Sequence, residues 1–447
     1  MATCASHHAR YSAPMVVGEF SQDADVAVIG AGPAGYACAF AAADAGRDVT
    51  LVDPHTTPGG HCLAEACIPS KTLLHAAAAR IAATSAGLLD DPPDLDAAAL
   101  SKWIRRCVNR LGKGLAGGAD QRKITLLQGR ARFLNGRELQ VAGEEVTRLR
   151  FKRAVVCTGS TRVEHSVLGD VQDIAGPEAL LADPSLATGR VAVIGSDVVA
   201  IETATIAAAL GAEVCLHTDG QPVLPDIPEL LTEALLKTSG LPINTTPLQT
   251  RPEADVIIDA ASRTAAIDSL NLGETDVQLQ NGWIAVNDQM QTDATRVLAA
   301  GDCVGPPLWA GAALAQGRVA AETIIGGSGC WDPTAISNVI FGPIELCWCG
   351  DATQHDDIAT HSVPWTYSGL AVAMGAPDGL TLIRWDRSSS TILGVGAVGR
   401  GAAEFATAAT IAVEMGVTLQ DLADMVPAHP TRGELIHEAA IQAMQLP

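Results

Sequence analysis

Two cysteines, Cys62 and Cys67, stand five positions apart, directly after the pair Gly59-Gly60. An Ala- and Leu-rich run at residues 72–83 predicts a helix, and the spacing predicts that both sulfurs lie near one face of its first turns. Such sulfurs are close enough for a small-loop disulfide, and a helix N-terminus favours thiolate. Two buried reduced cysteines, or half of a zinc site, are the alternatives. Zinc knuckles prefer a Cys-x-x-Cys pair, which the chain lacks.

A dinucleotide fingerprint precedes the cysteines. The apolar strand 26–29 leads into Gly30-Ala31-Gly32-Pro33-Ala34-Gly35, then an Ala-rich helix and a second strand that ends at Asp53. The first glycine makes the turn, the second lets a pyrophosphate approach, and the third lets helix meet strand, while the acid takes ribose hydroxyls. The complete context makes a chance match improbable.

Later stretches also show a strand that ends in small residues. Residues 153–160 form a strand that ends in small residues, and residues 297–302 end in Gly301-Asp302 ahead of a helix-like run. An Asp in that position suits a hydrogen bond to a ribityl or phosphate group. A second strand–helix–strand unit spans residues 191–216, so the chain carries one intact and one altered nucleotide-type unit.

Composition limits the class of protein. A chain of 447 residues predicts about three domains. The excess of 50 acidic over 29 basic side chains gives a net charge of −21, which disfavours nucleic acid and anionic membranes as partners. Residues 1–20 hold no apolar signal core, and no run reaches a membrane span. We therefore expect a cytoplasmic protein without a bound metal, with residues 1–22 as a flexible leader.

With these pieces in order, residues 24–446 resemble the pyridine-nucleotide disulfide oxidoreductases, and most closely their dihydrolipoamide dehydrogenase branch. The four stretches that carry the resemblance are Gly59-Gly60-His61-Cys62 to Cys67-Ile68-Pro69-Ser70-Lys71, Cys157-Thr158-Gly159-Ser160, Gly301-Asp302, and His429-Pro430-Thr431 with Glu434.

The resemblance implies an α/β fold with two Rossmann-like nucleotide-binding domains and a C-terminal α+β dimerisation domain. The FAD-binding domain would comprise residues 23–160 and 276–330, a trimmed NAD(P)-type domain residues 161–275, and the interface domain residues 336–447. The implied contacts to FAD come from Gly30, Gly32, Pro33, Ala34, Gly35, Asp53, Gly60, His61, Lys71, Thr158, Gly159, Ser160, Gly301 and Asp302.

The resemblance also implies the catalytic roles. Cys62 would be the thiol that exchanges with substrate, and Cys67 the thiol next to the flavin. Lys71 would sit beside the flavin, paired with Glu202. His429 of the partner subunit would shuttle the proton of Cys62 with Glu434 fixing its tautomer, which requires a homodimer. Thiol–disulfide exchange needs such an acid and base with a pKa near neutrality. Thr431 and Glu434 also fit a capping box of the last helix, and both roles are compatible.

The second unit departs from the family pattern. Asp197 replaces the middle glycine of its fingerprint, and its carboxylate would meet the pyrophosphate. Two unit charges about 4 Å apart, at an effective dielectric near 20, repel by roughly 4 kcal/mol. That corresponds to about a thousandfold in affinity. His217 stands where an acid should close the second strand, Ser262 stands where a glycine is usual, and residues 218–254 are too few for the usual extra strands.

We therefore interpret the chain as an FAD-dependent dithiol–disulfide oxidoreductase for a dihydrolipoyl-like or other small dithiol, or a lipoyl protein. Its acceptor need not be NAD(P), and oxygen, a quinone or another protein stay open. One alternative is an NAD-dependent dihydrolipoamide dehydrogenase with a divergent but working site. The other is a non-catalytic flavoprotein subunit.

Overall fold

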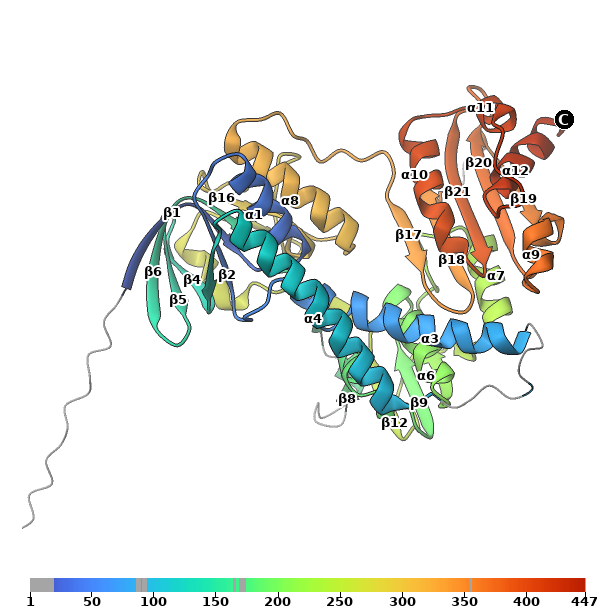
Figure 1. The fold of residues 1–447 in the computed structure, drawn as a ribbon, viewed down its shortest axis with the longest axis horizontal. Coiled ribbons are helices and arrows are strands. Elements are labelled where there is room, and N and C mark those ends of the chain that lie inside the picture. The colour runs from blue at the N-terminus through green and yellow to red at the C-terminus, as the bar shows by residue number, and fades with distance from the viewer. Residues whose placement is uncertain are drawn as a thin grey trace, which may run out of the picture.

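The structure is a computed structural model that describes residues 20–85, 90, 95–163, 166–168, 174–353 and 356–446. The expected leader falls mostly on residues 1–19, outside the described residues. Strand β1 begins at Phe20, so the expectation that the leader extends to residue 22 is wrong for its last three residues. The chain forms three parts, each built on its own sheet (Figure 1).

The first part is a seven-stranded sheet in the order β3-β2-β1-β6-β5-β4, with β16 paired to β6. Its central strands are parallel and buried, which explains their continuous apolar sequences. Helices α1 (Pro33–Asp44) and α8 (Ala310–Ile325) pack against each other (Figure 1). The strands are β1 (Phe20–Ile29), β2 (Val49–Asp53), β3 (Thr125–Gln128), β4 (Arg130–Asn135), β5 (Glu138–Ala142), β6 (Val146–Val156) and β16 (Val297–Ala299).

Three helices connect β2 to β3, namely α2 (Gly60–Ala64), α3 (Cys67–Ser85) and α4 (Ala97–Gln121). The two cysteines do not share the first turns of one helix, which corrects the sequence expectation. Cys62 lies within α2 and Cys67 opens α3, because the chain leaves the helix at Glu65 and re-enters it two residues later. The carboxylate of Asp96 caps α4 by accepting hydrogen bonds from the backbone N–H groups of Ala98 and Ala99.

The second part is a parallel sheet in the order β11-β10-β9-β12-β8. It is shorter than a full nucleotide-binding sheet, as the sequence predicts, because only the two-residue strand β11 lies between α7 and β12. Its elements are β8 (Ile174–Ala175), α5 (Pro177–Ala182), β9 (Arg190–Ile194), α6 (Val198–Ala209), β10 (Glu213–His217), α7 (Glu229–Ser239), β11 (Ile243–Asn244) and β12 (Val256–Asp259).

Two short antiparallel pairs lie outside these sheets. Strands β7 (Ser160–Val163) and β13 (Ser262–Ala265) form one two-stranded ribbon. Strands β14 (Leu279–Gln280) and β15 (Trp283–Ile284) form another.

The third part is an antiparallel sheet in the order β17-β18-β21-β20-β19. Buried Trp348 faces a cluster shared with Leu231 of α7, whereas Cys347 and Cys349 face the cluster that contains α10 and α12. These two cysteines therefore serve packing, as their spacing on a strand indicates. The elements are β17 (Ser337–Ile340), β18 (Glu345–Gly350), β19 (Ile358–Pro364), α9 (Gly369–Ala373), β20 (Leu380–Asp386), β21 (Ile392–Gly399), α10 (Ala406–Glu414), α11 (Leu419–Asp424) and α12 (Glu434–Met444).

Within the part of the chain that the structure describes, no helix combines the length and the apolar character needed to cross a membrane. In the same residues, no group of three or more His, Cys, Asp or Glu side chains is arranged to hold a metal ion.

Candidate active site

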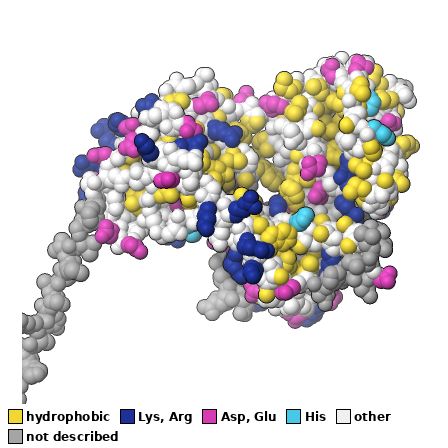
Figure 2. Space-filling model, viewed as in Figure 1, with side chains coloured by type: hydrophobic (Ala, Val, Ile, Leu, Met, Phe, Trp, Pro, Cys, Tyr) yellow, Lys and Arg dark blue, Asp and Glu magenta, His cyan; other side chains and the backbone are white. Residues whose placement is uncertain are grey.

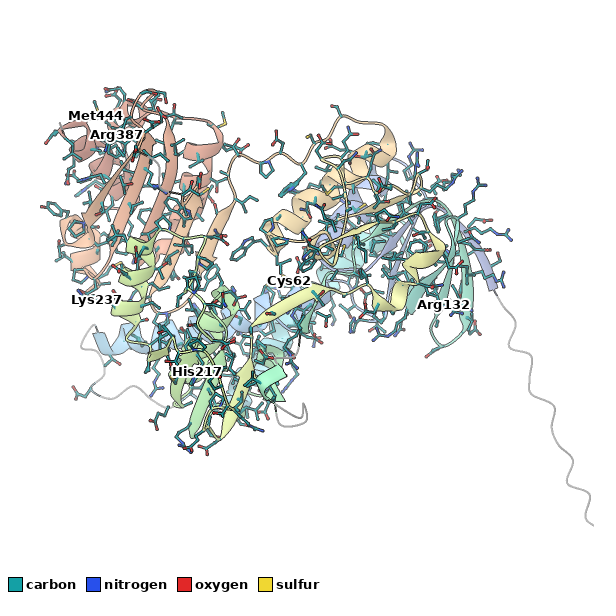
Figure 3. The ribbon with its side chains drawn as sticks, turned by 180° about the vertical axis from the view of Figure 1, so that it is seen from behind. Cys62, Arg132, His217, Lys237, Arg387 and Met444 are labelled. Atoms are coloured by element: carbon teal, nitrogen blue, oxygen red, sulfur yellow. The ribbon has the colours of Figure 1, made fainter. Side chains whose placement is uncertain are left out.

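A cavity of about 1630 Å³ lies where the three parts meet. Its lining comes from the turn before α1, from α2 and the start of α3, from the start of α6, and from β17. Figure 3 shows Cys62 at this junction. The elements that carry the chemistry-bearing residues of the sequence therefore converge on one space.

The two cysteines form a coupled pair in this cavity. Their sulfur atoms lie 2.6 Å apart, so a small movement suffices to form a disulfide of about 2.05 Å. The hydrogen bond that Cys62 donates lowers the pKa of the Cys67 thiol, against burial and with help from the Lys71 ammonium. The same hydrogen bond, together with burial, raises the pKa of Cys62. Of the two thiols in the reduced pair, Cys67 is therefore the one that loses its proton more readily.

Glu202 anchors the residues behind the cysteine pair. Its buried carboxylate lies 2.7 Å from Nζ of Lys71 and accepts a hydrogen bond of 2.9 Å from the hydroxyl of Ser70. The backbone N–H of Phe341 donates to the other carboxylate oxygen at 3.0 Å, and the Phe341 ring lies under the Lys71 ammonium. The predicted pairing of Lys71 with Glu202 is thus present in the structure. Ser70 and Phe341, which complete the cluster, had no assigned role in the sequence analysis.

The turn between β1 and α1 forms a cradle with room for a ligand backbone. Gly30 has φ +102°, and a Cβ there would lie 2.3 Å from the carbonyl oxygen of Cys157. A Cβ at Gly60 would lie 2.6 Å from the Cα of Gly32, so only glycines allow the two turns to approach this closely. Gly32 caps α1 without a side chain, which leaves the first N–H groups of the helix open to a phosphate.

Polar groups lie at the positions along this cradle where a dinucleotide needs partners. The carboxylate of Asp53 accepts from the backbone N–H of Ala31 at 2.7 Å, and the hydroxyl of Ser160 donates to Asp302 at 2.8 Å. The hydroxyl of Thr158 lines the cavity, is buried and has no hydrogen-bond partner among the described residues. These residues fit FAD, for which a bound ligand would supply the missing partner.

The corresponding turn of the second unit is closed by the chain itself. Asp197 occupies the N-cap of α6, and its carboxylate accepts from the backbone N–H of Ala200 at 3.0 Å. Its side chain lines the cavity, where water still reaches it although protein surrounds most of it, and this partial burial raises its pKa. At the end of the next strand, burial lowers the pKa of His217. A negative group of the protein therefore occupies the position that Gly32 leaves open in the first unit.

The predicted His–Glu pair is formed, but it lies away from the cavity. Nδ1 of His429 lies 2.7 Å from Glu434, which also accepts from the backbone N–H of Thr431. The expected capping box is not formed, because α12 begins at Glu434 with Gly433 at its N-cap, and the Thr431 hydroxyl instead donates to the backbone carbonyl of Ala428. The segment between α11 and α12 lies at the outer end of the third part, far from Cys62 (Figures 1 and 3). The His429 side chain is 78% exposed, so it is open to a second subunit.

His61 on α2 and Glu65, directly after the helix, form a second His–Glu pair, 3.0 Å apart and beside Cys62. Both line the cavity. The family resemblance implies that His61 contacts the cofactor, and its position in the lining is compatible with that role.

Known proteins share this arrangement. A family model described as pyridine nucleotide-disulphide oxidoreductase matches residues 24–247, and the model of its dimerisation domain matches residues 336–440. The dihydrolipoyl dehydrogenase of Buchnera aphidicola subsp. Acyrthosiphon pisum (strain APS) is 32% identical over 448 residues, covering 92% of this chain and 94% of the relative. The dihydrolipoyl dehydrogenase of Thermus scotoductus is 32% identical over 451 residues, covering 93% and 96%.

Solved structures share the fold. RclA from Escherichia coli, a flavoprotein disulfide reductase induced by HOCl and solved as a Cu(II) complex, has a TM-score of 0.84 at 21% identity, covering 94% of this chain and 99% of its own. LpdA from Mycobacterium tuberculosis has a TM-score of 0.84 at 20% identity, covering 95% and 100%.

The cysteine pair beside a dinucleotide cradle defines a flavoprotein disulfide oxidoreductase. With the family matches over both halves of the chain, the chain belongs to the pyridine nucleotide-disulphide oxidoreductase family. It is an FAD-dependent enzyme similar to dihydrolipoyl dehydrogenase, and it carries the family's dimerisation domain.

Replacing Lys71 tests the electrostatics of the pair. We expect Lys71→Met to raise the pKa of Cys67, because the variant removes the ammonium that favours its thiolate. Alkylation of Cys67 in the reduced protein, followed by mass spectrometry as a function of pH, measures this change. Lys237→Met, on the exposed side of α7, is the matched control and should leave the profile unchanged. If the pH profile of Cys67 alkylation were unchanged in Lys71→Met, Lys71 would not be the group that stabilises the Cys67 thiolate.

Proposed function

We propose that the enzyme oxidises a dithiol, either a dihydrolipoyl group or a similar small dithiol, through a Cys62–Cys67 disulfide. The observation that carries this proposal is the coupled pair itself. The two sulfurs lie 2.6 Å apart in the cavity, with the lower pKa on Cys67 and a lysine ion pair behind it. The leaving sulfur of a disulfide should be the one with the lower pKa, which makes Cys62 the sulfur that is attacked.

The exchange follows from these assignments. One substrate thiolate attacks Cys62, the Cys62–Cys67 bond breaks, and Cys67 leaves as a thiolate stabilised by Lys71. The second substrate thiol then attacks the substrate sulfur that is bonded to Cys62; the bond to Cys62 breaks, the substrate leaves as a disulfide, and Cys62 is reduced. The substrate thus loses two electrons and two protons. FAD, when bound, supplies the two-electron acceptor that returns the cysteines to the disulfide.

Proton transfer at Cys62 needs a group that can act as both acid and base. We propose that His429 of the partner subunit takes this role in a homodimer, with Glu434 holding the imidazole by its Nδ1. The geometry supports the assignment, because the bond to Glu434 leaves Nε2 free and the side chain is exposed.

The acceptor is the second element of the proposal. The carboxylate of Asp197 caps the helix end to which a pyrophosphate would bind, so the residues of the second unit do not fit NAD(P) well. We propose that NAD(P) binds weakly or not at all, and that oxygen, a quinone or another protein takes the electrons. The alternative is an NAD-dependent dihydrolipoamide dehydrogenase, which the names of the curated relatives favour. A non-catalytic subunit is disfavoured by the coupled cysteine pair.

Anaerobic titration of the FAD-loaded protein tests the function directly. We expect dihydrolipoamide to reduce it and to produce the long-wavelength band of a thiolate next to a flavin, whereas NADH at ordinary concentrations does not. Cys62→Ser should abolish reduction by the dithiol without loss of FAD. Failure of every dithiol to reduce the unmodified protein would overturn the proposed activity. Reduction by NADH would restore the NAD-dependent alternative.

Two substitutions at Asp197 distinguish the effect of its charge on NAD⁺ binding from the effect of its side-chain volume. Asparagine can still cap α6 but carries no charge. Tighter NAD⁺ binding by Asp197→Asn would therefore show that the charge of Asp197 repels the pyrophosphate. Tighter binding by Asp197→Gly alone would show that the side chain occupies the pyrophosphate position. The repulsion between Asp197 and the pyrophosphate is at most roughly 4 kcal/mol, so its removal should tighten NAD⁺ binding by about ten- to a thousandfold. Isothermal titration with NAD⁺ measures it, with Glu213→Gln on the exposed edge of β10 as the charge-matched control.

The raised pKa of Asp197 also predicts a pH dependence. The carboxyl becomes neutral as the pH falls through a value above its ordinary range, so NAD⁺ affinity of the unmodified protein should increase toward mildly acidic pH. Asp197→Asn should lack this increase. A parallel pH dependence in both proteins would contradict the assignment.

Mixing subunits tests the role of His429. Neither a Cys62→Ser dimer nor a His429→Ala dimer should be active, but a mixed dimer regains one intact site if the histidine acts across the interface. Random exchange should recover about a quarter of the unmodified activity. Mixing Cys62→Ser with Cys67→Ser is the control and should recover none, since both cysteines belong to one chain. No recovery in the first mixture would place the base elsewhere.

A further inference from the structure

Helix α4 carries a basic face that stands out on this acidic protein. Five basic side chains fall within residues 102–113, and no acidic residue occurs between Asp96 and Asp120. The five are Lys102, Arg105, Arg106, Arg110 and Lys113, and all are exposed. We call them the α4 basic face. Because the whole chain has a net charge of −21, this local excess of positive charge runs against its average.

The helical period gathers these residues on one side. Spacings of three and four residues place them along a single stripe, while Leu100 and Ile104 point into the core. Figure 2 shows Lys and Arg side chains gathered over α4. None of the five forms an ion pair with any residue that the structure describes, and the neighbouring Asp96 is engaged in the N-cap. The charges are therefore available to a partner.

The α4 basic face lies next to the redox site. Gly112 of α4 is buried where the helix meets α2, and a Cβ there would lie 2.4 Å from the Thr57 side chain and 3.7 Å from that of Leu63. Leu63 directly follows Cys62 on α2, so α4 flanks the helix that carries the exchanging thiol. The basic side chains themselves do not line the cavity among its described residues.

We propose that the α4 basic face docks an acidic protein domain that carries the dithiol substrate and presents it to Cys62; the inference rests on the proposed function. The stripe spans about 16 Å along the helix, at 1.5 Å per residue, which exceeds the size of a small dithiol and suits a protein surface. At physiological ionic strength charges act over about 8 Å. The face therefore attracts such a domain only at close range, beside the helix that carries Cys62.

Charge reversal on this face tests the inference. The substrates are a lipoyl carrier domain of net negative charge in its reduced form, and free dihydrolipoamide. The readout is the second-order rate constant for anaerobic reduction of the FAD-loaded protein by each dithiol. We expect Arg105→Glu/Arg106→Glu/Arg110→Glu to lower the rate constant for the carrier domain by about tenfold at low salt, since several exposed charges act together. Free dihydrolipoamide should react within about twofold of the unmodified rate, since a neutral dithiol gains nothing from the face.

The matched control is Arg132→Glu/Lys237→Glu/Arg387→Glu, which makes the same change in net charge at exposed positions on separate parts of the molecule (Figure 3). It should leave both rate constants unchanged. The docking inference would be overturned if the α4 variant lowered the rate constants of both dithiols equally, or lowered neither. It would also be overturned if the control variant lowered the rate constant for the carrier domain as much as the α4 variant does. A change of oligomeric state in sedimentation of the α4 variant would also overturn it, by showing that a second copy of the chain covers the face.

The two levels of proposal fail differently. If neither dithiol reduces the unmodified protein, the proposed function falls and the docking inference falls with it. If free dihydrolipoamide reduces it and the carrier domain reacts no faster at low salt than at high salt, only the docking inference falls.

Discussion

The buried carboxylate of Glu202 is the interaction on which the three parts of the molecule depend. It comes from α6 of the second part, binds Lys71 and Ser70 of α3 in the first part, and accepts the backbone N–H of Phe341 next to β17 of the third part. Removing Lys71 would leave the buried carboxylate without its counter-charge, which is destabilising even though Lys71 itself is only partly buried. The same carboxylate thus links the three parts and holds the lysine charge behind Cys67.

The two nucleotide-type units show how one position changes the use of a helix end. Both units have a glycine with positive φ after the first strand, Gly30 and Gly195, so the backbone turns alike. At the N-cap, Gly32 offers no side chain, whereas Asp197 supplies its own carboxylate to the helix. The first N–H groups of a helix favour an anion from either source. The first unit leaves that place to a ligand, and the second fills it from the chain.

The sequence predicts best what depends on local pattern. The fingerprint around Gly30, the cysteine pair and the pairing of Lys71 with Glu202 could be identified because each follows a short motif or a resemblance carried by one. The contact of Phe341 with Glu202 could not, since it joins residues 139 positions apart and involves a backbone N–H that any residue supplies. The break between α2 and α3 was also missed, although Pro69 indicates it. Proline has no N–H to donate to the carbonyl of Glu65 and its ring would clash there, so it disfavours one continuous helix and suits the first turn of a new one.

The second part has few edge strands but keeps the helix that carries Glu202. Its sheet is reduced at β11, a two-residue strand at the edge, whereas α6 joins the adjacent strands β9 and β10 near the centre. Loss of edge strands removes little that contacts the rest of the molecule. Loss of α6 would leave the Lys71 ammonium, the Ser70 hydroxyl and the Phe341 N–H without their shared acceptor. Whether or not this domain binds a nucleotide, it has to present Glu202, and for that it needs its first strand and α6.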